Sequence, residues 1–147
     1  MFNKKRKGIY DYLYNLFYDV VTKNVYEMYE PQELIPDDTE NGFIIISVGD
    51  INDESEFSNC AYGWARCYVQ AYIPPKSRGR VNWEKYEIFE NGIDGVIENA
   101  IANANANTTY HIQEGSFLSS DGEQVSNANN VFHTFIKSFI VFIDEEE

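Results

Sequence analysis

Positive charge is scarce in this chain, because 11 Lys and Arg residues stand against 24 Asp and Glu and leave a net charge of −13. A domain that binds nucleic acid freely needs cations, since neutralising phosphates supplies most of the non-specific affinity. The shortage of Lys and Arg therefore excludes that class of function. An acidic surface fits either a well-solvated protein or a wall past which DNA slides without sticking.

Cysteine is scarce, and the chain has two, Cys60 and Cys67. Both fall in one predicted strand, where they point to opposite faces and lie roughly 23 Å apart at ~3.3 Å per residue. A disulfide needs Cα atoms within about 7 Å, so the two cannot pair with each other. Two unpaired cysteines indicate a reducing compartment. Cys67, on a small apolar face, is predicted to be unreactive.

Catalytic and metal-binding motifs are missing as well. His111 and His133 have no cysteine or carboxylate at ligand spacing and are interpreted as ordinary strand residues. The acidic loop at 50–56 lacks the oxygen spacing and turn glycine of a calcium loop, which favours a solvated loop. No nucleophile elbow and no glycine-rich phosphate loop occurs. We therefore predict no enzyme activity, no metal and no cofactor.

Long apolar runs are also missing, since no window approaches 18 apolar residues. The hydrophobic N-terminal stretch is interrupted by Asp11, Asn15 and Asp19 and has no small-residue cleavage site, unlike a signal peptide. We expect a soluble protein that is made in a cytoplasm and has no membrane partner.

Aromatic residues are abundant, with 11 Tyr and 10 Phe, which excludes a disordered chain. The length favours a single domain over 1–147 with a substantial core. Residues 1–7 are interpreted as a basic N-terminal arm and 144–147 as an acidic tail. The many tyrosines favour an extensive interface, because Tyr joins an apolar ring to a polar hydroxyl.

The stretch from Cys60 to Ile73 is predicted to be one strand with two different faces, because side chains alternate along a strand. Its odd positions are small or apolar, which lets a helix lie close. Its even positions are large, aromatic and partly polar, which suits contact with another surface. The odd set is Ala61, Gly63, Ala65, Cys67, Val69, Ala71 and Ile73, and the even set is Cys60, Tyr62, Trp64, Arg66, Tyr68, Gln70 and Tyr72.

Two segments have the spacing of three and four residues that is typical of an amphipathic helix. The first runs from residue 8 to about 24. The second runs from 83 to about 103, with Asn82 as its N-cap. Gly92 and Gly95 lie inside the second helix, where each costs ~1 kcal/mol relative to Ala. We expect them to allow close packing on the small face of the long strand.

Further β-prone stretches predict strands at 25–29, 43–51, 108–118 and 131–143. The strands at 43–51 and 60–73 should form an antiparallel hairpin. Residues 119–130 are polar and are interpreted as a loop. The order α-β-β-β-α-β-β predicts an α+β fold with two helices and a four- to five-stranded, mostly antiparallel sheet.

The aromatic side of the long strand is too large to stay uncovered. Tyr62, Trp64, Tyr68 and Tyr72 could each bury about 150–250 Å², which together matches the ~800 Å² of one side of a standard interface. The cover is internal if the two helices lie on opposite sheet faces. It is another subunit if both helices lie on the small face.

A basic loop, Lys76 to Arg80, follows the long strand and carries Lys76, Arg78 and Arg80. It either aids solubility, or docks on an acidic partner or on DNA phosphates.

This element order resembles the tail-terminator, tail-completion and neck ring proteins of tailed bacteriophages. The stretches that carry the resemblance are GIYDYLYNLFYDVV, FIIISVGDI, CAYGWARCYVQAYI, NWEKYEIFENGIDGVIENAI and FHTFIKSFIVFID. The resemblance implies a ring-shaped homo-oligomer, stacked between other rings, with DNA passing through its bore. It implies no catalytic residues. The basic run at 4–7 has no match in the family pattern.

The sequence thus predicts a structural virion protein of a phage tail or neck, made in the bacterial host cytoplasm. Its expected partners are copies of itself in a closed ring and the adjacent portal, adaptor or tail ring proteins, with DNA as a passing, non-specific cargo. The expected interface comprises Tyr62, Trp64, Tyr68, Tyr72, Lys76, Arg78 and Arg80, besides the two termini. One alternative is a small nuclear-transport-factor-2-like module that holds an apolar ligand against Tyr62, Trp64 and Tyr68, in a pocket behind the first helix. Another is an acidic inhibitor that mimics DNA.

Overall fold

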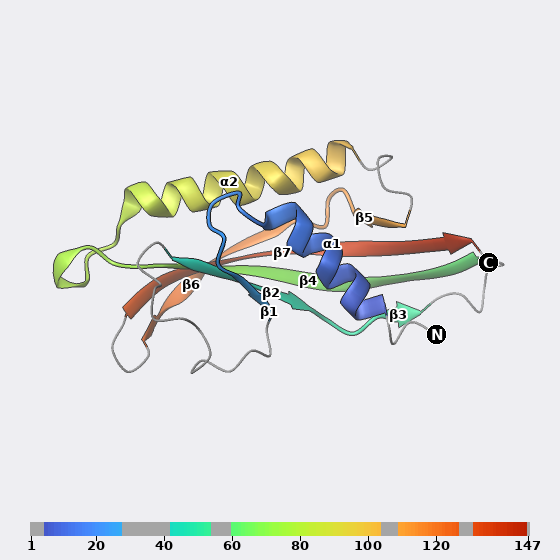
Figure 1. The fold of residues 1–147 in the computed structure, drawn as a ribbon, viewed down its shortest axis with the longest axis horizontal. Coiled ribbons are helices and arrows are strands. Elements are labelled where there is room, and N and C mark those ends of the chain that lie inside the picture. Colours follow the sequence, from blue (N-terminus) through green and yellow to red (C-terminus); the bar gives the residue numbers. More distant parts are fainter. Residues whose placement is uncertain (1–4, 28–41, 54–59, 104–108, 127–130, 147) are drawn as a thin grey trace.

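The computed structural model describes residues 5–27, 42–53, 60–103, 109–126 and 131–146, and it contains two helices and one mixed sheet (Figure 1). The helices are α1 (Lys5–Phe17) and α2 (Trp83–Ala102), and a short 3-10 turn spans Ser77–Gly79. The strands are β1 (Val25–Glu27), β2 (Phe43–Val48), β3 (Asn52–Asp53), β4 (Cys60–Ile73), β5 (Tyr110–Ile112), β6 (Leu118–Ser126) and β7 (Val131–Glu146).

The sheet confirms the predicted α+β class and has more strands than expected. Within the described residues seven strands pair in the order β1-β2-β4-β7-β5, with β3 also on β4 and β6 also on β7. The predicted hairpin is confirmed, since β2 and β4 are antiparallel. β1 is parallel to β2, which makes the sheet mixed. The longest pairing joins β4 to β7 from Cys60–Glu146 to Ile73–His133.

Several segments of the sheet were predicted with wrong bounds. The strand predicted at 43–51 ends at Val48. The polar stretch at 119–130 is not all loop, because β6 occupies 118–126 and pairs with β7. The strand predicted at 108–118 is reduced to β5 and is followed by a turn where Gly115 has φ +83°. The closing strand runs to Glu146, past its predicted end at 143, so most of the expected acidic tail is in a strand. Edge and end positions tolerate polar side chains because backbone hydrogen bonds form the ladder there.

The first helix begins earlier and ends earlier than predicted. Its first turn contains part of the basic run, and the Arg6 guanidinium donates to the Val48 carbonyl at 2.6 Å. Asp50 lies 3.8 Å from the same guanidinium. The helix ends at Phe17, two residues before Asp19 takes a positive φ of 59°. Arg6 therefore ties the start of α1 to the outer edge of β2.

Both helices cover the same face of the sheet. On β7 the Phe139 ring stacks on Phe17 of α1 at 6.5 Å, and the Phe135 ring lies 5.1 Å from Tyr86 of α2. Phe135 and Phe139 project from one face because they are four residues apart on a strand. The small residues predicted for the helix-facing side of β4 are fully buried there, namely Ala65, Cys67, Val69, Ala71 and Ile73.

The second helix was predicted almost to the residue. It begins at Trp83, and the Asn82 side chain accepts a hydrogen bond from the Lys85 amide at 3.2 Å, as an N-cap should. The expected role of its glycines was wrong. A Cβ at Gly92 would collide with the Val21 side chain, beyond the end of α1, and a Cβ at Gly95 would meet nothing within 4 Å.

The two glycines give a matched pair of substitutions. Gly95→Ala is expected to raise the free energy of unfolding by about 0.5–1 kcal/mol, because Ala restricts the unfolded chain and is favoured in a helix. Gly92→Ala should lose that gain, because its methyl group displaces Val21. Urea denaturation of both variants measures the difference, and an equal effect at the two positions would contradict the packing of Gly92.

Candidate interface on the aromatic sheet face

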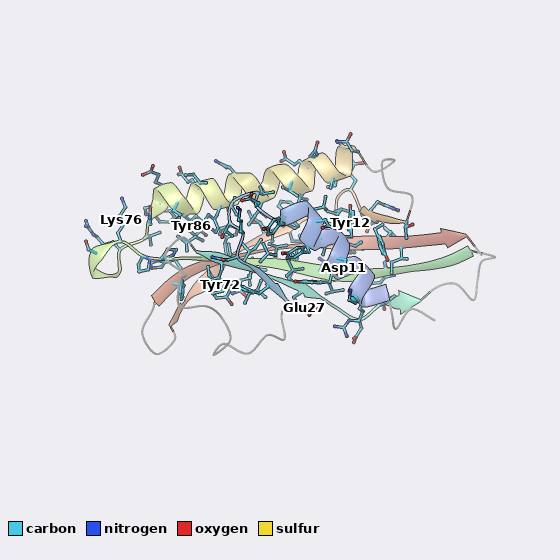
Figure 2. All side chains as sticks on the ribbon, in the orientation of Figure 1. Asp11, Tyr12, Glu27, Tyr72, Lys76 and Tyr86 are labelled. Carbon is cyan, nitrogen blue, oxygen red and sulfur yellow. The ribbon has the colours of Figure 1, made fainter. Side chains whose placement is uncertain are left out.

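The sheet has a second face, opposite the helices, which we call the aromatic face. It consists of the even-numbered β4 side chains from Trp64 to Tyr72 and their neighbours on β2, β5, β6 and β7. Figure 2 shows Tyr86 on the helix side and Tyr72 on the other side of the strands. Within the described residues no helix lies on the aromatic face. The sequence left this arrangement open, and the structure has both helices on the small face.

One end of the aromatic face is packed internally. The Tyr72 ring stacks on Phe43 with centroids 4.4 Å apart, and the Phe132 ring meets both edge-on. Phe43 and Phe132 are each only 3% exposed. Burial raises the pKa of Tyr72 above its usual value. Tyr72, predicted as an interface residue, therefore belongs mainly to an intramolecular cluster.

The centre of the aromatic face is more open. Tyr68 is 39% exposed and lies opposite Ser47 on β2 and Ser138 on β7. Leu118 of β6 is opposite Ser138 on its other side and is 58% exposed. Small serines beside Tyr68 and Leu118 leave both apolar side chains standing above their surroundings, as expected of a contact surface.

Polar and aromatic groups complete the open part of the face. The half-buried Arg66 guanidinium donates to the Ser138 hydroxyl at 3.4 Å. Trp64 pairs across the strands with Phe142, whose ring stacks on His111 at 5.4 Å. Trp64 and Tyr68, both predicted from the sequence, thus lie on one continuous surface.

The other predicted residues lie apart from this centre. Tyr62 pairs through its backbone with Asp144 at the far end of β4, and its side chain is outside the described part of the structure. The loop with Lys76 and Arg80 projects at the end of the molecule opposite the labelled termini (Figure 1). Lys76 is exposed, and the Arg80 side chain donates to the Ser77 carbonyl at 3.4 Å. The side chain of Arg78 is also outside the described part.

The two histidines are far apart along β7, because His111 pairs with Phe142 whereas His133 pairs with Ile73. Among the described residues no group of three or more His, Cys, Asp or Glu side chains is placed to hold a metal ion. In the same part of the chain, neither helix has the length and apolar character needed to cross a membrane.

Burial makes Cys67 a poor nucleophile, as predicted. It raises the pKa of the fully buried thiol to about 12, against a small opposing effect of Arg66. At pH 8 the thiol of the folded protein is therefore almost entirely protonated. We expect iodoacetamide to leave Cys67 unmodified in the folded protein and to alkylate it in urea, as peptide mass spectrometry can show. Rapid alkylation of the folded protein at pH 8 would contradict the burial.

The same shift has a stability consequence. The unfolded thiol ionises near pH 9 and the folded one near 12, so its stabilising contribution is complete below pH 9 and declines above it.

Sequence reasoning missed one buried charged group. Lys137 lies on the helix side of β7 and is 2% exposed, with its ammonium 2.9 Å from Glu90 and 3.2 Å from Asp94 of α2. It also donates to the Ser119 hydroxyl at 2.8 Å. The available signal was a lone lysine in an apolar strand, together with two carboxylates four residues apart on the second helix.

Comparison of the chain with protein-family models and with curated proteins found no match to either. The chemistry of the described site is therefore the guide to function. It offers an apolar surface with one cation, which is suited to holding another macromolecule.

Proposed function

We propose that the chain is a structural subunit that closes into a homo-oligomeric ring in the tail or neck of a tailed bacteriophage. The observation that carries the proposal is that both helices lie on one sheet face, while Tyr68 and Leu118 stand exposed on the other. For that arrangement the sequence predicts another subunit as the cover of the aromatic face. The order of elements, with a leading helix, a hairpin, a basic loop, a second helix and closing strands, supports the resemblance.

The proposed mechanism is mechanical. Heterologous contacts between unlike surfaces of neighbouring copies close a ring when the rotation between them divides a full turn. A charge of −13 on each copy would surround the bore with negative potential, so that passing DNA is not retained. The exposed loop with Lys76 and Arg80 is placed at one end of the molecule, where it suits an acidic neighbouring ring.

The geometry does not favour the ligand-binding alternative. That alternative needs Trp64 and Tyr68 behind the first helix, yet both lie on the face away from it. The space between α1 and the sheet is filled by buried side chains, including Phe17 and Phe139.

Electron microscopy of the purified chain, alone and mixed with any portal or tail ring protein that neighbouring genes encode, tests the proposal. We expect closed rings of uniform size, formed either by the chain alone or on a partner ring. We expect Tyr68→Glu to abolish them, because it buries a charge in the contact. Tyr68→Phe is the matched control and should assemble. A chain that remains monomeric and joins no partner ring would contradict the proposed function.

A further inference from the structure

Five of the six exposed large apolar side chains of the described residues fall on two opposite sides of the molecule. The sixth, Trp83, is 61% exposed at the start of α2, with its ring 5.3 Å from Tyr86. On the aromatic face, Tyr68 and Leu118 stand with the half-buried Ile136, Ile140 and Arg66, and we call this set the sheet patch. The other set lies on the helix layer and is made of Tyr18 and Val20 beyond α1 and Ile88 and Gly95 of α2. We call it the helix patch.

The helix patch joins α2 to the segment that follows α1. A Cβ on Gly92 would lie 3.5 Å from Val20, and Ile88 is one turn earlier on α2. Gly95 comes seven residues after Ile88, so both lie on the same outward side of the helix. Ile88 is 57% exposed and Val20 is 42% exposed. The helix layer therefore has an apolar surface, and beside it Gly95 leaves the helix backbone uncovered by a side chain.

The edges of the sheet are poorly suited to joining copies by strand addition. β1 offers three residues, and Arg6 already occupies the Val48 carbonyl at the outer edge of β2. On the opposite edge, β5 and β6 are separated by a turn in which the Ser116 hydroxyl accepts from the Ile140 amide at 2.9 Å. β6 also has an irregular register between Asp121 and Gln124. A short edge strand such as β1 and an irregular one such as β6 are less suited to pairing with another chain. We therefore expect contact between copies through the sheet and helix faces.

The charges of the two patches are complementary. Arg66 lies in the sheet patch. Among the described residues it forms a hydrogen bond with Ser138 and no ion pair. The outward side of α2 carries exposed carboxylates around the helix patch, at Glu84, Glu87 and Glu98. A sheet patch facing another sheet patch would bring two surfaces of like charge together, each with its Arg66. A sheet patch facing a helix patch places the guanidinium among carboxylates.

We propose that the sheet patch of one copy of this chain docks on the helix patch of a second copy, with Arg66 set against the acidic side of α2. This inference rests on the proposed ring function and names the contact that closes the ring. The two patches lie on opposite sides of one subunit, so each copy uses one patch toward each neighbour. Such a contact is heterologous and repeats from copy to copy.

The test is a charge exchange followed by sedimentation velocity, over a concentration series that ends at about 1 mM. Arg66→Glu and the combined Glu84→Lys/Glu87→Lys/Glu98→Lys variant should each weaken self-association about tenfold or more. Arg66→Lys keeps the charge and should weaken it least. Mixing the two reversed variants should restore assembly, because the carboxylate introduced in one variant then meets the lysines introduced in the other.

Gly95→Gln provides a variant that does not depend on charge. Nothing lies within 4 Å of a Cβ there and Gln favours a helix more than Gly does, so the monomer should keep or raise its melting temperature while association weakens. Unchanged association of Arg66→Glu, of the combined Glu→Lys variant and of Gly95→Gln would overturn the inference, and so would a wild-type chain that stays monomeric up to about 1 mM. If rings nevertheless form on a partner ring, the proposed function stands and only this contact is wrong. If no ring forms anywhere, both fail.

Discussion

Replacing Lys137 with Met is expected to lower the free energy of unfolding by about 2–4 kcal/mol. The ammonium of Lys137 is the shared partner of Glu90 and Asp94, at 2.9 and 3.2 Å. Removing one member of a buried ion pair leaves uncompensated charge and costs about 3–5 kcal/mol where all members are fully buried. Here the Lys137 side chain is 3% exposed and the two carboxylates are 33% and 30% exposed. Their access to water moderates the penalty.

The matched control removes the whole cluster. Lys137→Met combined with Glu90→Gln and Asp94→Asn leaves no unpaired charge, so it should recover much of the lost stability. Equilibrium urea denaturation of the wild type, the single variant and the triple variant measures both effects. A triple variant that is as unstable as the single variant would show that the contacts of the lysine ammonium with the Phe117 and Phe135 rings, and not its pairing with the carboxylates, dominate.

This cluster shows where sequence reasoning ends. Periodicity assigns a residue to a face of a strand, and it correctly separated Cys67 from Trp64 and Tyr68. It predicted α2 with its Asn82 cap, because local spacing and capping chemistry decide a helix start. The contact of Lys137 with Glu90 spans 47 residues, and no local pattern specifies it.

The errors in the sheet have a related cause. β6 is an edge strand that pairs on one side with β7, so its polar residues need no apolar neighbours and imitate a loop. The parallel pairing of β1 with β2 depends on how the chain crosses between them, which composition does not reveal. Likewise, the sequence required a cover for the aromatic face without fixing the side on which each helix lies. That choice is set by packing, for example by Phe17 against Phe139.

Phe17→Ala is expected to be the most damaging single truncation in α1, with a loss of about 3–5 kcal/mol. Phe17 is fully buried at the last turn of the helix, where its ring stacks on Phe139 at 6.5 Å. The shortened side chain leaves a cavity between α1 and β7 that neither rigid element can close. Tyr18→Ala is the matched control next to it, since that ring is 44% exposed and should cost less than about 1 kcal/mol.

The Phe17 substitution also separates stability from assembly. Its cavity loosens the end of α1, where Tyr18 and Val20 contribute to the helix patch, so hydrogen exchange should accelerate along α1 while β4 and β7 stay protected. Association should then weaken with Phe17→Ala through loss of order, and with Tyr18→Ala through loss of contact at unchanged stability. If Tyr18→Ala destabilised the fold as much as Phe17→Ala, the helix patch would be part of the core, and its docking role would have to be abandoned.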